Sequence, residues 1–202
     1  MSRARATLIW GALGVAVAMP VIAAAASPLL AWRQPVYIVA GFAGIVAMAM
    51  LLVQPLLAGG YLPGLSTFRL RRLHRLTGLA LVCAVVIHVG GLWITSPPDV
   101  IDALLFVSPT PFSAWGVIAM WAVFAAALLA VMRRRLHMRF LTWRLCHATL
   151  AAVTVIGSVV HTLLIEGTME AMTKTALCGL VLLASVGTSA RLRVSDLRGR
   201  RG

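Results

Sequence analysis

Six long apolar runs dominate the pattern of hydrophobic and polar positions along this chain. They cover residues 7–26, 35–57, 74–95, 111–132, 143–165 and 172–190. Each is close to the ~20 residues that cross a ~30 Å hydrocarbon core as a helix. A spanning segment must satisfy its backbone hydrogen bonds internally, which favours helices over strands with open edges. The pattern therefore predicts an all-α fold, a polytopic membrane bundle of six helices.

The composition supports lipid as the solvent for this bundle. Of 202 residues, 61% are hydrophobic and only 11% are charged, with a mean hydropathy of +0.97. A soluble domain of this length could not hide so much apolar surface in one core. The connections between the runs are too short to fold separately. We expect one membrane domain over residues 1–202.

The first run has an alternative interpretation as a cleaved signal peptide. Arg3 and Arg5 precede it, and small residues (Ala23-Ala24-Ala25-Ala26-Ser27) end it. Signal peptides share these features, but their apolar core usually has 7–15 residues, fewer than this run contains. We therefore expect residues 7–26 to be a membrane span, with removal as a signal peptide as the alternative.

The net charge of +13 is distributed as expected for a membrane topology. With the amino terminus inside, all of the 18 lysines and arginines except Arg33 and Lys174 fall on the cytoplasmic face. Four of the five acidic residues fall on the outer face: Asp99, Asp102, Glu166 and Glu170. We expect both termini to be cytoplasmic, and the high alanine and arginine content favours a bacterial inner membrane. Nucleic acid is not an expected partner, because no folded basic surface with interleaved aromatic residues is present.

Two of the runs carry histidines at the same spacing. His74 and His88 are 14 positions apart, and so are His147 and His161. On a helix, 14 residues rise about 21 Å and stop ~40° short of four turns, so each pair shares one stripe near opposite membrane surfaces. One span separates the two runs, which makes the two helices parallel. If the helices are neighbours, His74 faces His147 at the inner depth and His88 faces His161 at the outer depth.

This arrangement is suited to haem. A haem iron accepts axial imidazoles from both sides, so a flat macrocycle can lie between two helices that each contribute one histidine. Two depths predict two b haems with all four histidines as iron ligands, the irons about 21 Å apart. Leu145-Cys146-His147 lacks the first cysteine of a C-x-x-C-H motif, so no thioether link is expected.

The histidines have two other possible roles, as core residues or as zinc ligands. A single histidine on an apolar face is usually a core residue that hydrogen-bonds a carbonyl, but four at matched depths favour a functional site. Zinc needs a compact tetrahedral ligand set, whereas each depth offers only two imidazoles. A haem-free six-helix membrane scaffold or small-molecule carrier is the alternative function.

Other residues near the histidines are candidates for haem contacts. Three arginines lie within one turn of the inner histidines: Arg72, Arg75 and Arg144. They are possible partners for haem propionates, which are carboxylates, although topology alone also places arginines there. Gly78, Gly90 and Gly91 are candidates for close approach of a macrocycle to the backbone.

The remaining histidine and the cysteines have simpler interpretations. His137, in a basic stretch between two runs, is expected to be a solvated loop residue. Cys83, Cys146 and Cys178 lie within apolar segments, where cysteine usually acts as a small buried hydrophobe. They predict no disulfide framework.

Two stretches of the sequence resemble the ferric reductase-like transmembrane domain family. They are Arg71-Arg72-Leu73-His74-Arg75-Leu76-Thr77-Gly78 continuing to His88, and Trp143-Arg144-Leu145-Cys146-His147 continuing to His161. The family includes ferric reductases, NADPH oxidases and stand-alone haem subunits of periplasmic methionine sulfoxide reductases. The resemblance implies a six-helix bundle whose two b haems pass electrons from the cytoplasmic to the outer face.

The chain departs from the reductases and oxidases in one respect. It contains no G-x-G-x-x-G motif, and no flavin or nicotinamide site is expected in it. We therefore expect an electron-transfer subunit of an oxidoreductase with a separate donor, either a cytoplasmic flavoprotein reductase or a membrane quinol. The expected acceptor on the outer face is ferric ion or a periplasmic redox protein.

Overall fold

The computed structural model describes the backbone of residues 2–199 and the side chains of residues 2–194, and within this range every regular element is helical. The elements are α1 (Arg3–Ala25), the 3-10 helix η1 (Pro28–Trp32), α2 (Pro35–Ala58), α3 (Thr67–Thr95), α4 (Pro97–Leu104), α5 (Pro111–Met132), α6 (Phe140–Leu164) and α7 (Ala171–Gly199). Six of these helices, all except α4 and η1, are long and apolar enough to cross a membrane. The predicted all-α, multi-pass membrane fold is confirmed.

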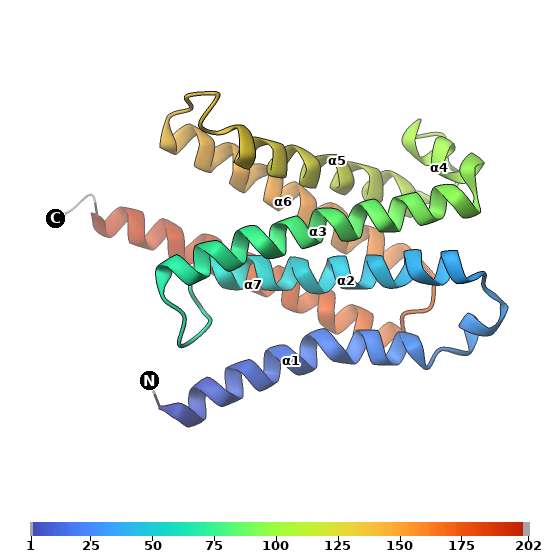
Figure 1. Ribbon diagram of the computed structural model, residues 1–202, viewed down its shortest axis with the longest axis horizontal. Coiled ribbons are helices and arrows are strands. Elements are labelled where there is room, and N and C mark those ends of the chain that lie inside the picture. The colour runs from blue at the N-terminus through green and yellow to red at the C-terminus, as the bar shows by residue number, and fades with distance from the viewer. Residues whose placement is uncertain (1, 200–202) are drawn as a thin grey trace.

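The long helices run up and down along one common direction (Figure 1). Two antiparallel hairpins, α2 with α3 and α5 with α6, have the closest packing in the bundle. Helix α7 packs against α2 and α6, and α1 lies against α2 and α7. The start of α1 and the end of α7 lie at the same end of the bundle, together with the α2–α3 loop and the α5–α6 turn (Figure 1).

That end is called the basic end here, because most of the arginines gather there. Arg3 and Arg5 begin α1, Arg69 to Arg75 begin α3, and Arg133 to Arg139 form the turn before α6. The other end, called the far end, holds the four acids named above. Arg198, Arg200 and Arg201 were also expected on the basic side, but their side chains lie outside the described residues.

Several helices extend beyond the apolar runs that predicted them. Helix α3 begins at Thr67, where the Ser66 hydroxyl accepts a hydrogen bond from the Arg69 amide at 3.4 Å, and not at residue 74. Helix α6 begins at Phe140 and α7 continues to Gly199. Hydropathy marks the part of a helix that contacts lipid, whereas caps and basic residues let the helix continue into the interface. The short helix α4 was not predicted, because its eight residues are too few to span a membrane and lie between the apolar runs.

The interior is packed with small and medium apolar side chains. A cluster that includes Met48, Leu81, Val155, Leu177 and Val181 joins α2, α3, α6 and α7. Cys178 belongs to this cluster, whereas Cys83 and Cys146 are exposed on the bundle surface, so only one of the three cysteines fits the expected buried role. All three are free thiols, as predicted.

Close helix approach depends on glycine at specific positions. A Cβ atom on Gly91 of α3 would lie 2.7 Å from Ala40 Cβ and 3.3 Å from the Val36 carbonyl oxygen of α2. Lipid tails are as apolar as leucine, so membrane helices associate largely through such van der Waals contact. Gly91 therefore sets the distance between α2 and α3 near the far end.

We predict that Gly91→Ala destabilises the protein by about 1–3 kcal/mol, the usual cost of overpacking a well-packed contact. The thermal unfolding midpoint of the purified protein in detergent measures this. Gly90→Ala is the matched control, because no atom lies within 4 Å of a Cβ added at Gly90. Equal midpoints for the two variants would show that α2 and α3 are not held at this distance.

Candidate functional site

Four histidines face one another in two pairs between α3 and α6. The ring centroids of His74 and His147 are 6.4 Å apart, with an angle of 71° between the ring planes. Those of His88 and His161 are also 6.4 Å apart, with an angle of 80°. The structure thus brings together the pairs expected from depth. We call them the basic-end pair (His74, His147) and the far-end pair (His88, His161).

The two helices that carry the histidines do not pack closely on each other. Helix α3 packs mainly on α2, and α6 packs mainly on α5. The imidazole rings therefore reach toward each other across a gap between the two hairpins.

Backbone carbonyls orient three of the four rings. His88 Nδ1 lies 2.8 Å from the Ala40 carbonyl oxygen, and His161 Nδ1 lies 2.9 Å from that of Phe112. His74 Nδ1 lies 3.3 Å from the backbone carbonyl oxygen of Gln54. A carbonyl only accepts, so Nδ1 carries the hydrogen in these contacts and Nε2 keeps its lone pair for a metal.

The fourth ring makes a weaker version of the same contact. His147 Nδ1 is buried and has no hydrogen-bond partner among the described residues. The backbone of Ala126 on α5 interacts with this ring, but without the geometry of a hydrogen bond. A small shift of the ring would complete the pattern that the other three histidines show.

These contacts show that the second hairpin repeats the first. The facing groups on α2, Ala40 and Gln54, are 14 positions apart, and so are those on α5, Phe112 and Ala126. The offset between hairpins is 72 residues for these groups and 73 residues for the histidines. Each hairpin thus offers two imidazoles in the same orientation. The histidine spacing is evident in the sequence, whereas the matching spacing on the preceding helices is not.

Two glycines at equivalent positions in this repeat make room for the far-end pair. A Cβ on Gly44 would lie 3.0 Å from His88 Nδ1, and one on Gly116 would lie 2.7 Å from His161 Nδ1. The glycines expected to admit a macrocycle were Gly78, Gly90 and Gly91. That expectation is wrong for Gly78 and Gly91, whose nearest neighbours belong to α2, and Gly90 has no neighbour within 4 Å.

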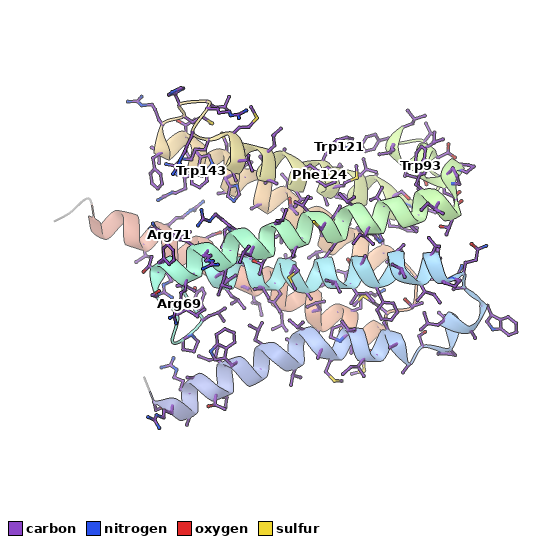
Figure 2. The ribbon with its side chains drawn as sticks, viewed as in Figure 1. Arg69, Arg71, Trp93, Trp121, Phe124 and Trp143 are labelled. Carbon is purple, nitrogen blue, oxygen red and sulfur yellow. The ribbon has the colours of Figure 1, made fainter. Side chains whose placement is uncertain are left out.

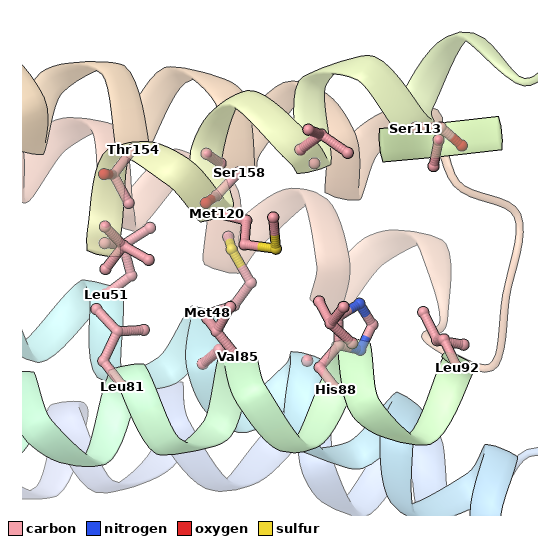
Figure 3. A pocket seen from close by; sticks show the side chains of 18 of the residues that line it. Met48, Leu51, Leu81, Val85, His88, Leu92, Ser113, Met120, Thr154 and Ser158 are labelled. Atoms are coloured by element: carbon pink, nitrogen blue, oxygen red, sulfur yellow. The ribbon is translucent and has the colours of Figure 1, made fainter. Parts of the chain in front are cut away.

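The layer midway between the two pairs is apolar with one hydroxyl. Its members are one residue from each hairpin helix: Met48, Leu81, Met120 and Thr154. All four are buried and line a cavity of about 150 Å³ that extends to His88. Figure 3 shows both methionine side chains in this cavity, with His88 on the same wall as Val85 and Leu92. Met48 and Met120 are another pair related by the 72-residue offset.

The basic-end pair has an aromatic neighbour for which no role was predicted from the sequence. Trp143 lies one turn before His147 and stacks on its ring, with centroids 5.5 Å apart and planes at 14°. The guanidinium of Arg133 lies 4.5 Å from the centre of the Trp143 ring. The indole Nε1 is buried and lacks a hydrogen-bond partner among the described residues.

The other candidate residues lie where their positions in the chain predicted. Arg72 and Arg75 are exposed at the basic end, and Arg144 is half-buried one turn before His147. Their contact with propionates stays a prediction. Figure 2 shows Trp143 and Arg71 at this end of the bundle. His137 is an exposed turn residue with φ of 46°, as expected.

The described residues contain no group of three or more His, Cys, Asp or Glu side chains that could hold a metal ion. A tetrahedral zinc site needs such a group. Two opposed imidazoles at each level match the ligand set that a haem iron takes from a protein.

Comparison with known proteins identifies the family. The sequence model of the ferric reductase like transmembrane component matches residues 40–158, more than half of the chain. The chain belongs to this family. The match begins at Ala40 and ends three residues before His161, so it covers nearly the whole repeat and three of the four facing histidines. No curated protein and no solved structure shows a significant match.

Domains of this family generally bind haem, and the residues present fit that group. An imidazole nitrogen binds a first-row metal at about 2 Å and lies about 1.1 Å from its ring centre, so two rings on one iron have centroids about 6 Å apart. The observed 6.4 Å in both pairs agrees with this value. The glycines beside the far-end rings and the carbonyls on Nδ1 supply the remaining requirements, space and a fixed tautomer.

We predict that Gly116→Ala and Gly44→Ala each impair haem binding at the far-end pair, because the added Cβ displaces a ring that must stay in line with its partner. Loss of up to one haem per chain, measured by absorbance of the purified protein, is the expected result. Gly41→Ala on α2 is the control, since nothing lies within 4 Å of its added Cβ. Full occupancy in both test variants would mean that these glycines do not shape the site.

Proposed function

We propose that this protein is a di-haem b transmembrane electron-transfer component that carries electrons from the cytoplasmic side to an acceptor on the outer face. Family membership supports a membrane electron-transfer role. The observation that supports two haems is the pair of opposed imidazoles at each of two depths. In this proposal His74 and His147 hold the inner haem, and His88 and His161 hold the outer one. A bound haem supplies one-electron redox chemistry.

The hairpin carbonyls prepare the histidines for this role. A histidine that donates its Nδ1 hydrogen keeps Nε2 as the ligand atom, and the hydrogen bond makes that nitrogen more basic. Because the acceptors belong to the backbone of α2 and α5, they stay in place whatever side chain those positions carry. The rings of His74, His88 and His161 are therefore oriented by the helix that packs against their own helix.

The middle layer between the two levels is mostly apolar. Met48, Leu81 and Met120 offer no hydrogen-bond donor to water, and the Thr154 hydroxyl donates to the Leu150 carbonyl of its own helix at 2.9 Å. Little in this layer could hold a water molecule, which needs two to four polar partners.

The charge distribution supports the proposed orientation of the protein in the membrane. Arginines at the basic end follow the positive-inside rule, so we place that end and both termini in the cytoplasm of a bacterial cell. The donor would be a flavoprotein reductase or a membrane quinol, and the acceptor would be ferric ion or a periplasmic redox protein. A separate donor follows from the proposal that this chain binds neither flavin nor nicotinamide.

Glu170, one of the acidic residues at the far end, has a structural role. The Glu170 carboxylate accepts hydrogen bonds from the backbone amides of Met172 and Thr173, both at 2.8 Å. These bonds hold the pKa of Glu170 below its usual value. The side chain is ionised at neutral pH and caps the amino-terminal end of α7.

We predict that His88→Ala lowers the haem content from two per chain to one and leaves the basic-end haem in place, and that His74→Ala has the complementary effect. Reduced-minus-oxidised spectra of the purified variants measure this. His137→Ala is the control, because His137 is exposed in a turn and should not affect either haem.

The same spectra distinguish the alternative function. A colourless wild-type preparation from haem-replete cells would favour a haem-free membrane scaffold or small-molecule carrier. Two haems retained in His88→Ala would show that haem is bound but that the pairing by depth is incorrect.

A further inference from the structure

The indole of Trp143 carries a buried hydrogen-bond donor with no acceptor among the described residues. Indole Nε1–H can only donate. A buried polar group without a partner destabilises the fold, so such groups in native proteins usually meet a ligand or an ordered water. Trp143 lies one turn from His147 on the same face of α6 and stacks on its ring. Its unpaired donor is therefore next to the proposed inner haem site.

Packing alone does not account for the tryptophan. The equivalent residue of the first hairpin, at an offset of 73 residues, is Leu70. A leucine fills that position before His74 without any donor. Trp143 is also held from outside the helix, since Arg133 of the α5–α6 turn lies over its ring. The second hairpin thus has a fixed donor that the first hairpin lacks.

The described side chains around Trp143 supply further donors. Arg71 and Arg144 are equivalent residues in the repeat, each three positions before the inner histidine of its helix. Among the side chains that the structure describes, every carboxylate lies at the far end. A buried N–H beside a group of cations suits a carboxylate that is brought in by a ligand.

We propose that Trp143 donates its Nε1–H to a propionate carboxylate of the inner haem, an inference that rests on the proposed function. The donor lies beside His147 at the basic end, so it is placed to contact the inner haem and not the outer one. A charge-assisted hydrogen bond to the propionate withdraws negative charge from the neighbourhood of the iron. Less negative charge near the iron favours the reduced form, so this contact raises the reduction potential of the inner haem.

The test is Trp143→Phe in the His88→Ala background, which leaves the inner haem as the single haem to titrate. Phenylalanine keeps a ring against His147 and Arg133 but removes the N–H. We expect the reduction equilibrium to shift three- to tenfold toward the oxidised form, a fall of up to 59 mV for a one-electron couple. Trp121→Phe is the control, because Trp121 is exposed on α5, where it packs on Phe124.

Haem b dimethyl ester identifies the acceptor. Its propionates are esterified, so reconstitution with it removes the proposed charged acceptor. We expect Trp143→Phe to cause no further shift in protein loaded with the ester. An equal shift with free haem and with the ester would overturn the proposal and point to a bound water or to packing.

A second variant separates the loss of the N–H group from a folding defect caused by Trp143→Phe. Benzothienylalanine at position 143 keeps the bicyclic shape of indole and replaces the N–H with sulfur. It must reproduce the Trp143→Phe shift, and an unchanged potential in this variant would also overturn the proposal. Failure of the proposed function is a separate result, since it would appear as absence of haem from the His88→Ala parent.

Discussion

The hydrogen bond from a histidine Nδ1 to a backbone carbonyl of the neighbouring helix is the contact on which the site depends. It is formed by His74, His88 and His161, and His147 approaches it at Ala126. Each bond ties the ligand helix of a hairpin to the helix before it. Because α3 and α6 scarcely pack on each other, these bonds and the hairpin packing together fix where the four imidazoles point. Gly44 and Gly116 are needed because a Cβ atom at either position would displace the ring of His88 or His161 from its carbonyl partner.

The fold follows from repeating that hairpin with the same orientation. Two parallel copies place equal histidine offsets at equal depths, and the midpoint of each copy contributes the apolar layer of Met48, Met120, Leu81 and Thr154. The repeat is not perfect at the basic end. Trp143 replaces the leucine of the first copy, so the two copies are chemically distinct at the basic-end level.

The six spans, the family and the facing of the histidines could be predicted from sequence, because apolar length and a 14-residue spacing depend on helix geometry alone. The start of α3 at Thr67 and the short helix α4 could not, since caps and interfacial helices leave little hydropathy signal. The roles of Gly44, Gly116 and Trp143 depend on which faces of different helices meet. Glycine is common in membrane helices, so only the structure separates Gly44 from Gly90.

The central claim is that electrons cross the membrane through this one chain. Proteoliposomes that contain the purified protein and trapped ferricyanide test it most directly, with a membrane-impermeant reductant added outside. The account predicts that the trapped ferricyanide is reduced by vesicles with the wild-type protein and not by vesicles with His88→Ala. Failure of reduction in wild-type vesicles that contain two reducible haems per chain would contradict it, and so would equal rates in both.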